Sequence, residues 1–128
     1  MDYLILTSGV VATLATIGHF TMGNKMYVKP VMDSNADEIP KRVMLSVFHY
    51  MSVYMVLTVV ILIAFSFGEN LVFENPSDVL KIIGFSYAGF AAAQLIVAFT
   101  TPIKMAVFKM FQWIFWILIA VFALLAAF

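Results

Sequence analysis

Residues 43–67 read VMLSVFHYMSVYMVLTVVILIAFSF and contain no Asp, Glu, Lys or Arg. A helix rises by about 1.5 Å per residue, so this segment is longer than the roughly 30 Å thickness of the hydrocarbon core of a bilayer. Three similar stretches flank it at 3–22, 82–99 and 105–128, and apart from the histidines the only charged side chain in any of the four is Lys109. The pattern predicts an integral membrane protein with four membrane-spanning helices.

Composition supports the same class of protein. Hydrophobic residues make up 64% of the 128-residue chain and charged residues 11%, whereas about a quarter of the residues of a soluble domain are charged. We therefore expect a single transmembrane domain over residues 1–128. The formal net charge is zero, and we expect no nucleic acid as partner. Cysteine is absent, which excludes disulfides and thiol redox chemistry.

Prolines and acidic residues mark where the helices begin. Asn75, Pro76 and Asp78 suit an N-cap, a first helical position and a first turn. The predicted helices run over residues 3–22, 38–67, 76–100 and 104–128. The short connections after the second and third helices force antiparallel neighbours, so the fold class is all-α, an up-down-up-down antiparallel four-helix bundle.

Basic residues set the predicted orientation. Six of the seven Lys and Arg residues lie in or beside the first and third connections, at Lys25, Lys29, Lys41, Arg42, Lys104 and Lys109. The positive-inside rule places loops 23–37 and 100–104 in the cytoplasm and both termini outside, as in a bacterial-type inner membrane.

Small residues predict where the helices touch. In lipid, helices associate through close backbone approach rather than apolar burial. Ser8, Ala12 and Thr16 form one stripe at four-residue spacing, and a second stripe consists of Gly84, Ala88 and Ala92. We expect both stripes to be helix contacts.

Each predicted helix also places one polar side chain at a similar depth, about 9–12 Å inside the cytoplasmic boundary. These residues are His19, His49, Gln94 and Gln112. Ionisable residues at such depth are candidates for a functional site. Ser46, Ser52 and Tyr87 give this polar layer further hydrogen-bonding groups.

The simplest role of the layer is to hold helices together by hydrogen bonds. No catalytic motif is present, so we do not expect an enzyme. The leading hypothesis is a non-enzymatic accessory, assembly or structural subunit of a membrane complex. Thirteen phenylalanines leave much aromatic surface facing lipid or protein, which favours a homo-oligomer or other membrane subunits as partners.

The histidines support two alternative functions. His19 and His49 at equal depth on adjacent helices suit the axial ligands of a b-type haem in an electron-transfer protein. Met22 lies one turn from His19, and thioether with imidazole ligands suits a copper(I) site at His19, His49 and Met22. A small proton-linked transporter or channel is the second alternative, with a histidine that titrates near neutrality.

Overall fold

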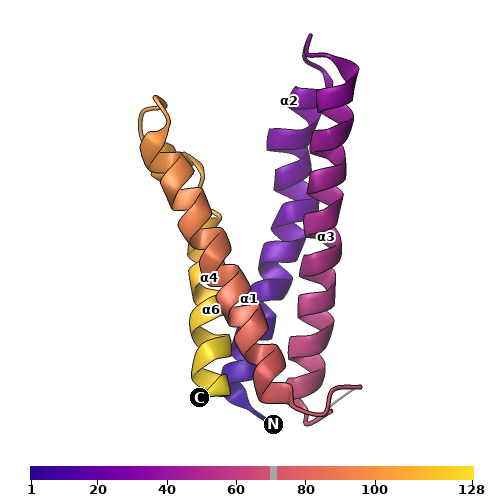
Figure 1. Ribbon diagram of the computed structural model, residues 1–128, viewed down its shortest axis with the longest axis vertical. Coiled ribbons are helices and arrows are strands. Elements are labelled where there is room, and N and C mark those ends of the chain that lie inside the picture. The colour runs from indigo at the N-terminus through magenta and orange to yellow at the C-terminus, as the bar shows by residue number, and fades with distance from the viewer. Residues whose placement is uncertain (70–71) are drawn as a thin grey trace.

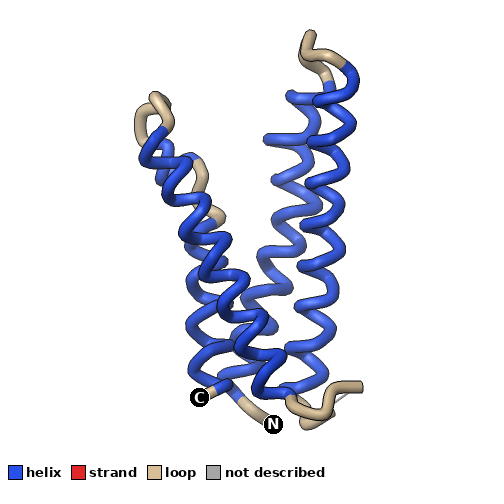
Figure 2. Tube along the Cα trace, viewed as in Figure 1, coloured by secondary structure: helices blue, strands red, loops and turns tan. Residues whose placement is uncertain are grey.

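The computed structural model describes residues 1–69 and 72–128 and consists of helices and their connections, with no β-strand in either range. The all-α class is therefore confirmed (Figure 2). In chain order the elements are α1 (Tyr3–Gly18), the π-helix η1 (His19–Val28), α2 (Lys29–Met32), α3 (Glu38–Ser66), α4 (Pro76–Thr100), α5 (Ala106–Lys109) and α6 (Trp113–Ala127).

The helices form two antiparallel hairpins. The first hairpin joins the continuous segment α1–η1–α2 to α3, and the second joins α4 to α5 and α6. Both chain termini lie at the same end of the molecule, where α6 packs on both α1 and α4 (Figure 1). From that end the hairpins diverge toward the connections that follow α2 and α4, and the molecule has the outline of a V.

Three segments are long and apolar enough to cross a membrane: Tyr3–Met32, Glu38–Ser66 and Pro76–Thr100. Helix α6 is apolar but shorter, with 15 residues, or about 22 Å at the usual helical rise. These lengths support integration of the chain into a membrane.

The first helical segment continues to Met32, whereas the sequence analysis ends it at residue 22 and places a loop at 23–37. The prediction followed the end of the apolar stretch at residue 22, after which the basic residues Lys25 and Lys29 appear. In the structure the backbone widens here into η1, where the N–H of Lys29 bonds the carbonyl of Asn24 five residues earlier. The wider turn directly precedes Pro30, which lies inside the helical segment as part of α2.

The fourth helix is broken, although the sequence predicts one continuous helix over 104–128. Residues 110–112 separate α5 from α6. A break at membrane depth exposes carbonyls that need new donors, and side chains supply these donors. Gln94 donates to the carbonyl of Met110 at 2.9 Å, and Trp113 Nε1 donates to that of Val107 at 2.9 Å.

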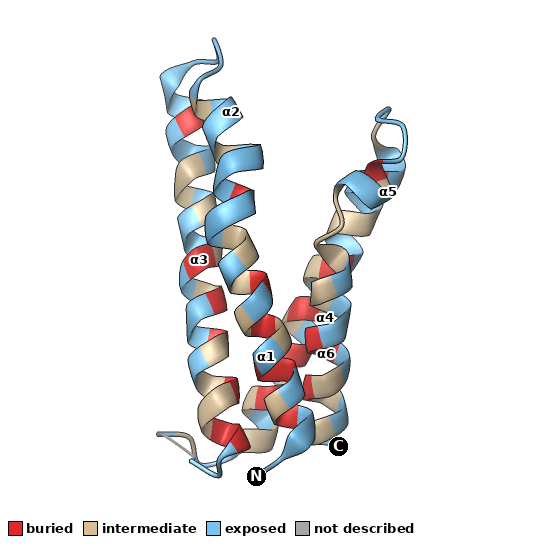
Figure 3. Ribbon diagram, turned by 180° about the vertical axis from the view of Figure 1, so that it is seen from behind, coloured by how far each residue is buried: buried red, intermediate tan, exposed pale blue. Residues whose placement is uncertain are grey.

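Buried residues concentrate at the end where the termini lie (Figure 3). The hydroxyl of Ser8 donates to the carbonyl of Ile119 at 3.0 Å across the two hairpins. Gly84 lies so close to α6 that an added Cβ would stand 2.5 Å from Leu124 Cγ. The predicted stripes therefore make contacts at Ser8, Ala12 and Gly84, whereas Ala92 is exposed and its neighbour Ala91 is buried instead.

Candidate functional site

His19 is the first residue of η1, where the α-helix widens. Its ring stacks on the ring of Phe48 from α3, with centroids 3.9 Å apart. Its Nε2 lies 2.8 Å from the hydroxyl oxygen of Ser52, also on α3. Two residues of α3 thus fix the position and tilt of the imidazole. Local π-geometry is rare and is often found at functional sites.

His49 has a different environment from His19. Its side chain is exposed on α3, and its ring meets Phe48 edge-on with centroids 5.8 Å apart. Phe48 contacts both imidazole rings. Because Nε2 of His19 already bonds Ser52, ligation of haem iron through that atom requires loss of this bond. The haem site at His19 and His49 stays a prediction.

Gln94 is the centre of a second polar cluster, between α4 and the broken fourth helix. Its amide nitrogen donates to the carbonyl of Met110 at 2.9 Å and to Oε1 of Gln112 at 2.7 Å. Its amide oxygen accepts from Nε1 of Trp116 at 2.9 Å. Gln94 therefore holds the backbone break in place and fixes the side chains of Gln112 and Trp116.

Two other members of the predicted layer lie outside these clusters. Tyr87 is fully buried, with its ring against those of Tyr54 and Trp116. Its hydroxyl has no hydrogen-bond partner among the residues of the described ranges. Ser46 donates to the carbonyl of Arg42 on its own helix at 2.9 Å and makes no bridge between helices.

A cavity of about 310 Å³ lies between the hairpins and brings the two clusters together. His19 belongs to one wall, formed by the end of α1 and by η1, and Gln112 and Trp116 belong to the other, formed by the start of α6. The remaining lining residues are apolar or small: Leu14, Ala15, Ile17, Gly18, Thr21, Met22, Gly23, Phe111 and Phe115.

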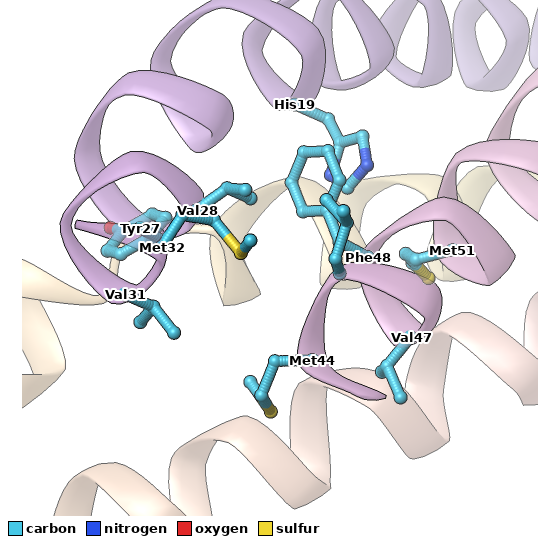
Figure 4. A pocket seen from close by; sticks show the side chains of 10 residues that line it. His19, Tyr27, Val28, Val31, Met32, Met44, Val47, Phe48 and Met51 are labelled. Carbon is cyan, nitrogen blue, oxygen red and sulfur yellow. The ribbon is translucent and has the colours of Figure 1, made fainter. Parts of the chain in front are cut away.

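A second cavity, of about 300 Å³, lies within the first hairpin between its two helical segments (Figure 4). Its walls are apolar and include the thioethers of Met32, Met44 and Met51. His19 and Phe48 also line it, so the imidazole of His19 borders both cavities.

The structure brings together two of the three residues of the predicted copper site. Met22 and His19 line the inter-hairpin cavity together, but His49 does not belong to that lining. Within residues 1–69 and 72–128 no cluster of three or more His, Cys, Asp and Glu side chains is placed to hold a metal ion. A site at His19, His49 and Met22 stays a prediction.

The sequence analysis missed Phe48, Gly23 and Trp116 as parts of the site. Aromatic and glycine residues are common in membrane helices, and their spacing gave no reason to single these three out. A signal for Trp116 did exist, because it lies one turn after Gln112 and shares a helix face with it.

Comparisons with models of protein families, with characterised proteins and with solved structures found no match to this chain.

Proposed function

We propose that this protein is a small membrane carrier that binds a small molecule in the cavity between its two hairpins. One observation supports the proposal above others: both irregular stretches of backbone, η1 and the break between α5 and α6, line the same cavity. Non-helical backbone at membrane depth occurs where it is buried in protein or lines a cavity. Discontinuous helices form the substrate sites of many transporters.

The form and chemistry of the cavity agree with this role. A volume of about 310 Å³ suits a small ligand, and mostly apolar walls with a few fixed polar groups are typical of ligand sites. His19 and Gln112 are each held by a neighbouring helix, so they present their polar atoms with little loss of side-chain freedom on binding.

The shape of the molecule suggests a route to the cavity. The hairpins are packed at the end that holds the termini and diverge at the other end. Between the cavity and the open end, the hydroxyl of Tyr27 reaches across to the carbonyl of Lys109 at 3.4 Å. With the orientation that the basic residues favour, the open end faces the cytoplasm and both termini lie outside.

Single-cysteine labelling tests the proposal directly, because the chain has no cysteine of its own. The test variants are Gln112→Cys and Thr21→Cys, both in the cavity lining. We expect a membrane-impermeant maleimide to label them in sealed inside-out vesicles, since a carrier site must be reached by water. The matched control is Val60→Cys, which is 53% exposed on α3 in a lipid-facing position and remains unlabelled.

Failure of both test variants to react from either side would contradict the carrier proposal. It would favour an accessory or structural subunit, the second candidate. That candidate is supported by large aromatic side chains at the surface, since Phe85, Phe99 and Phe108 are 61%, 74% and 71% exposed. Cross-linking in native membranes that joins the chain to another polypeptide is the corresponding positive result.

A further inference from the structure

The contacts around Ser52 favour one of the two neutral forms of the His19 ring. A serine hydroxyl has one hydrogen to donate, and Ser52 donates it to the carbonyl of Phe48 at 3.0 Å. With its hydrogen on that carbonyl, the oxygen of Ser52 accepts from Nε2 of His19, which lies 2.8 Å away. An imidazole at membrane depth is costly to charge. The neutral ring protonated on Nε2 carries a lone pair on Nδ1 and is a hydrogen-bond acceptor there.

Gly23 lies beside this nitrogen. A Cβ on Gly23 would lie 3.9 Å from Nδ1 of His19, and both residues line the inter-hairpin cavity. Of the two ring nitrogens, Nε2 is the one that lies within hydrogen-bonding distance of Ser52. The wall formed by η1 thus offers one acceptor and no side chain at position 23 to shield it.

The opposite wall offers a donor. The amide oxygen of Gln112 accepts from Gln94 at 2.7 Å, which fixes the amide orientation. The amide nitrogen of Gln112 makes no hydrogen bond to the residues that the structure describes, so both of its N–H groups are free to donate. Among the residues that the structure describes, no Asp, Glu, Lys or Arg lines the cavity. A charged ligand would lose its hydration there without an ionic partner.

We infer that the inter-hairpin cavity recognises an uncharged small molecule that carries both a hydrogen-bond donor and an acceptor. Nδ1 of His19 accepts from the ligand, and the amide nitrogen of Gln112 donates to it. A primary carboxamide has this chemistry, and so does a protonated carboxylic acid. The inference rests on the proposed carrier function, because it names the ligand class of the same cavity.

The experiment uses the full chain, labelled with ¹⁵N-histidine, in lipid nanodiscs. The His49→Gln variant leaves one histidine signal and changes no residue of the cavity lining. We expect the ¹⁵N spectrum of His19 to show a protonated Nε2 and an unprotonated Nδ1. Titration with propionamide is expected to shift the Nδ1 signal upfield in a saturable manner, as a new hydrogen bond forms. Propionate at neutral pH and methylammonium are expected to produce no shift.

A pair of glycine substitutions tests the recognition geometry. In Gly23→Ala the new methyl meets Phe48 at 3.5 Å, Gly18 O at 3.8 Å and His19 Nδ1 at 3.9 Å, all ordinary contacts, so the fold is retained. The methyl shields Nδ1, and we expect propionamide to bind about tenfold more weakly, the equivalent of one hydrogen bond. Gly89→Ala is the control, because a Cβ there meets nothing within 4 Å.

The outcomes separate this inference from the carrier proposal. A spectrum with the proton on Nδ1 overturns the inference whatever the cysteine labelling shows. Cysteine labelling without a shift from either propionamide at neutral pH or propionate at acidic pH leaves the carrier proposal standing and overturns the ligand class. Propionate binding only at acidic pH, with no response to propionamide, identifies the protonated acid as the ligand and supports the inferred chemistry.

Discussion

Gln94 shows how one side chain allows an irregular backbone inside a membrane. It makes three hydrogen bonds, to Met110, Gln112 and Trp116, and these bonds connect α4 to the break before α6. An unsatisfied backbone carbonyl in a nonpolar setting costs free energy. Removal of the Gln94 amide therefore lowers the stability of the fold by more than the net free energy of one hydrogen bond.

We predict that Gln94→Leu lowers the free energy of unfolding by about 2 kcal/mol, because it leaves the carbonyl of Met110 and the indole N–H of Trp116 without partners. The measurement is equilibrium unfolding in mixed detergent micelles. Ser86→Ala on the same helix is the control, since its hydroxyl bonds only its own helix, at the carbonyl of Ile82, and its loss is expected to cost less than about 0.5 kcal/mol. Equal effects of the two changes would contradict this role of Gln94.

The polar layer could be predicted only in part from single residues. Helical rise predicted a similar depth for the four polar residues, but the pairing of His19 with Ser52 rather than with His49 depends on the rotation of each helix about its axis. That rotation depends on packing between helices. The spacing of residues along the sequence does not predict this rotation.

At the scale of helices, close packing of α4 on α6 holds the second hairpin together. An added Cβ on Gly84 would lie 2.5 and 2.7 Å from Leu124 side-chain atoms and 3.3 Å from the carbonyl of Ala120. Since apolar burial adds little to helix association in lipid, close approach at Gly84 contributes a large part of the stability of this pair.

We predict that Gly84→Ala destabilises the protein by about 1–3 kcal/mol, the usual cost of overpacking, because the backbone of Ala120 cannot move without shifting α6. Gly89→Ala, five residues further on the same helix and in open space, is expected to be neutral or slightly stabilising through its better helix propensity. Thermal unfolding followed by circular dichroism distinguishes the two. A Gly84→Ala variant that unfolds at the same temperature as the unchanged protein would contradict this prediction. It would show that α4 and α6 can move apart with little loss of folding free energy.

Helix positions were predictable where hydropathy and capping agree, as for α4, whose bounds Pro76–Thr100 match the sequence analysis. The two failures lie at residues 23–32, where the helix continues, and at residues 110–112, where it breaks. Other helices contribute in both places: α3 packs beside η1, and Gln94 of α4 donates to the carbonyl of Met110 in the break. Local sequence rules do not include partners from other helices.

For the whole molecule, the antiparallel order follows from hydropathy and short connections, but the divergence of the hairpins does not. In water, exposed apolar faces would draw the hairpins together. In lipid that force is weak, so two hairpins joined at one end can adopt more than one angle. A carrier needs such freedom, because it must open and close around its ligand.

Distance measurements between spin labels test this freedom without any ligand. Labels on Ser34→Cys and Ile103→Cys report on the open end, where the two connections lie. Labels on Thr7→Cys and Leu125→Cys lie on exposed positions of α1 and α6, the two helices that pack across the hairpins. We predict a broad or two-component distance distribution for the first pair and a single narrow one for the second.

Propionamide is expected to narrow the distribution of the first pair, because a ligand that bridges His19 and Gln112 favours one separation of the two walls. Two narrow, ligand-independent distributions would identify a rigid scaffold, in which the cavity serves assembly with a partner rather than transport.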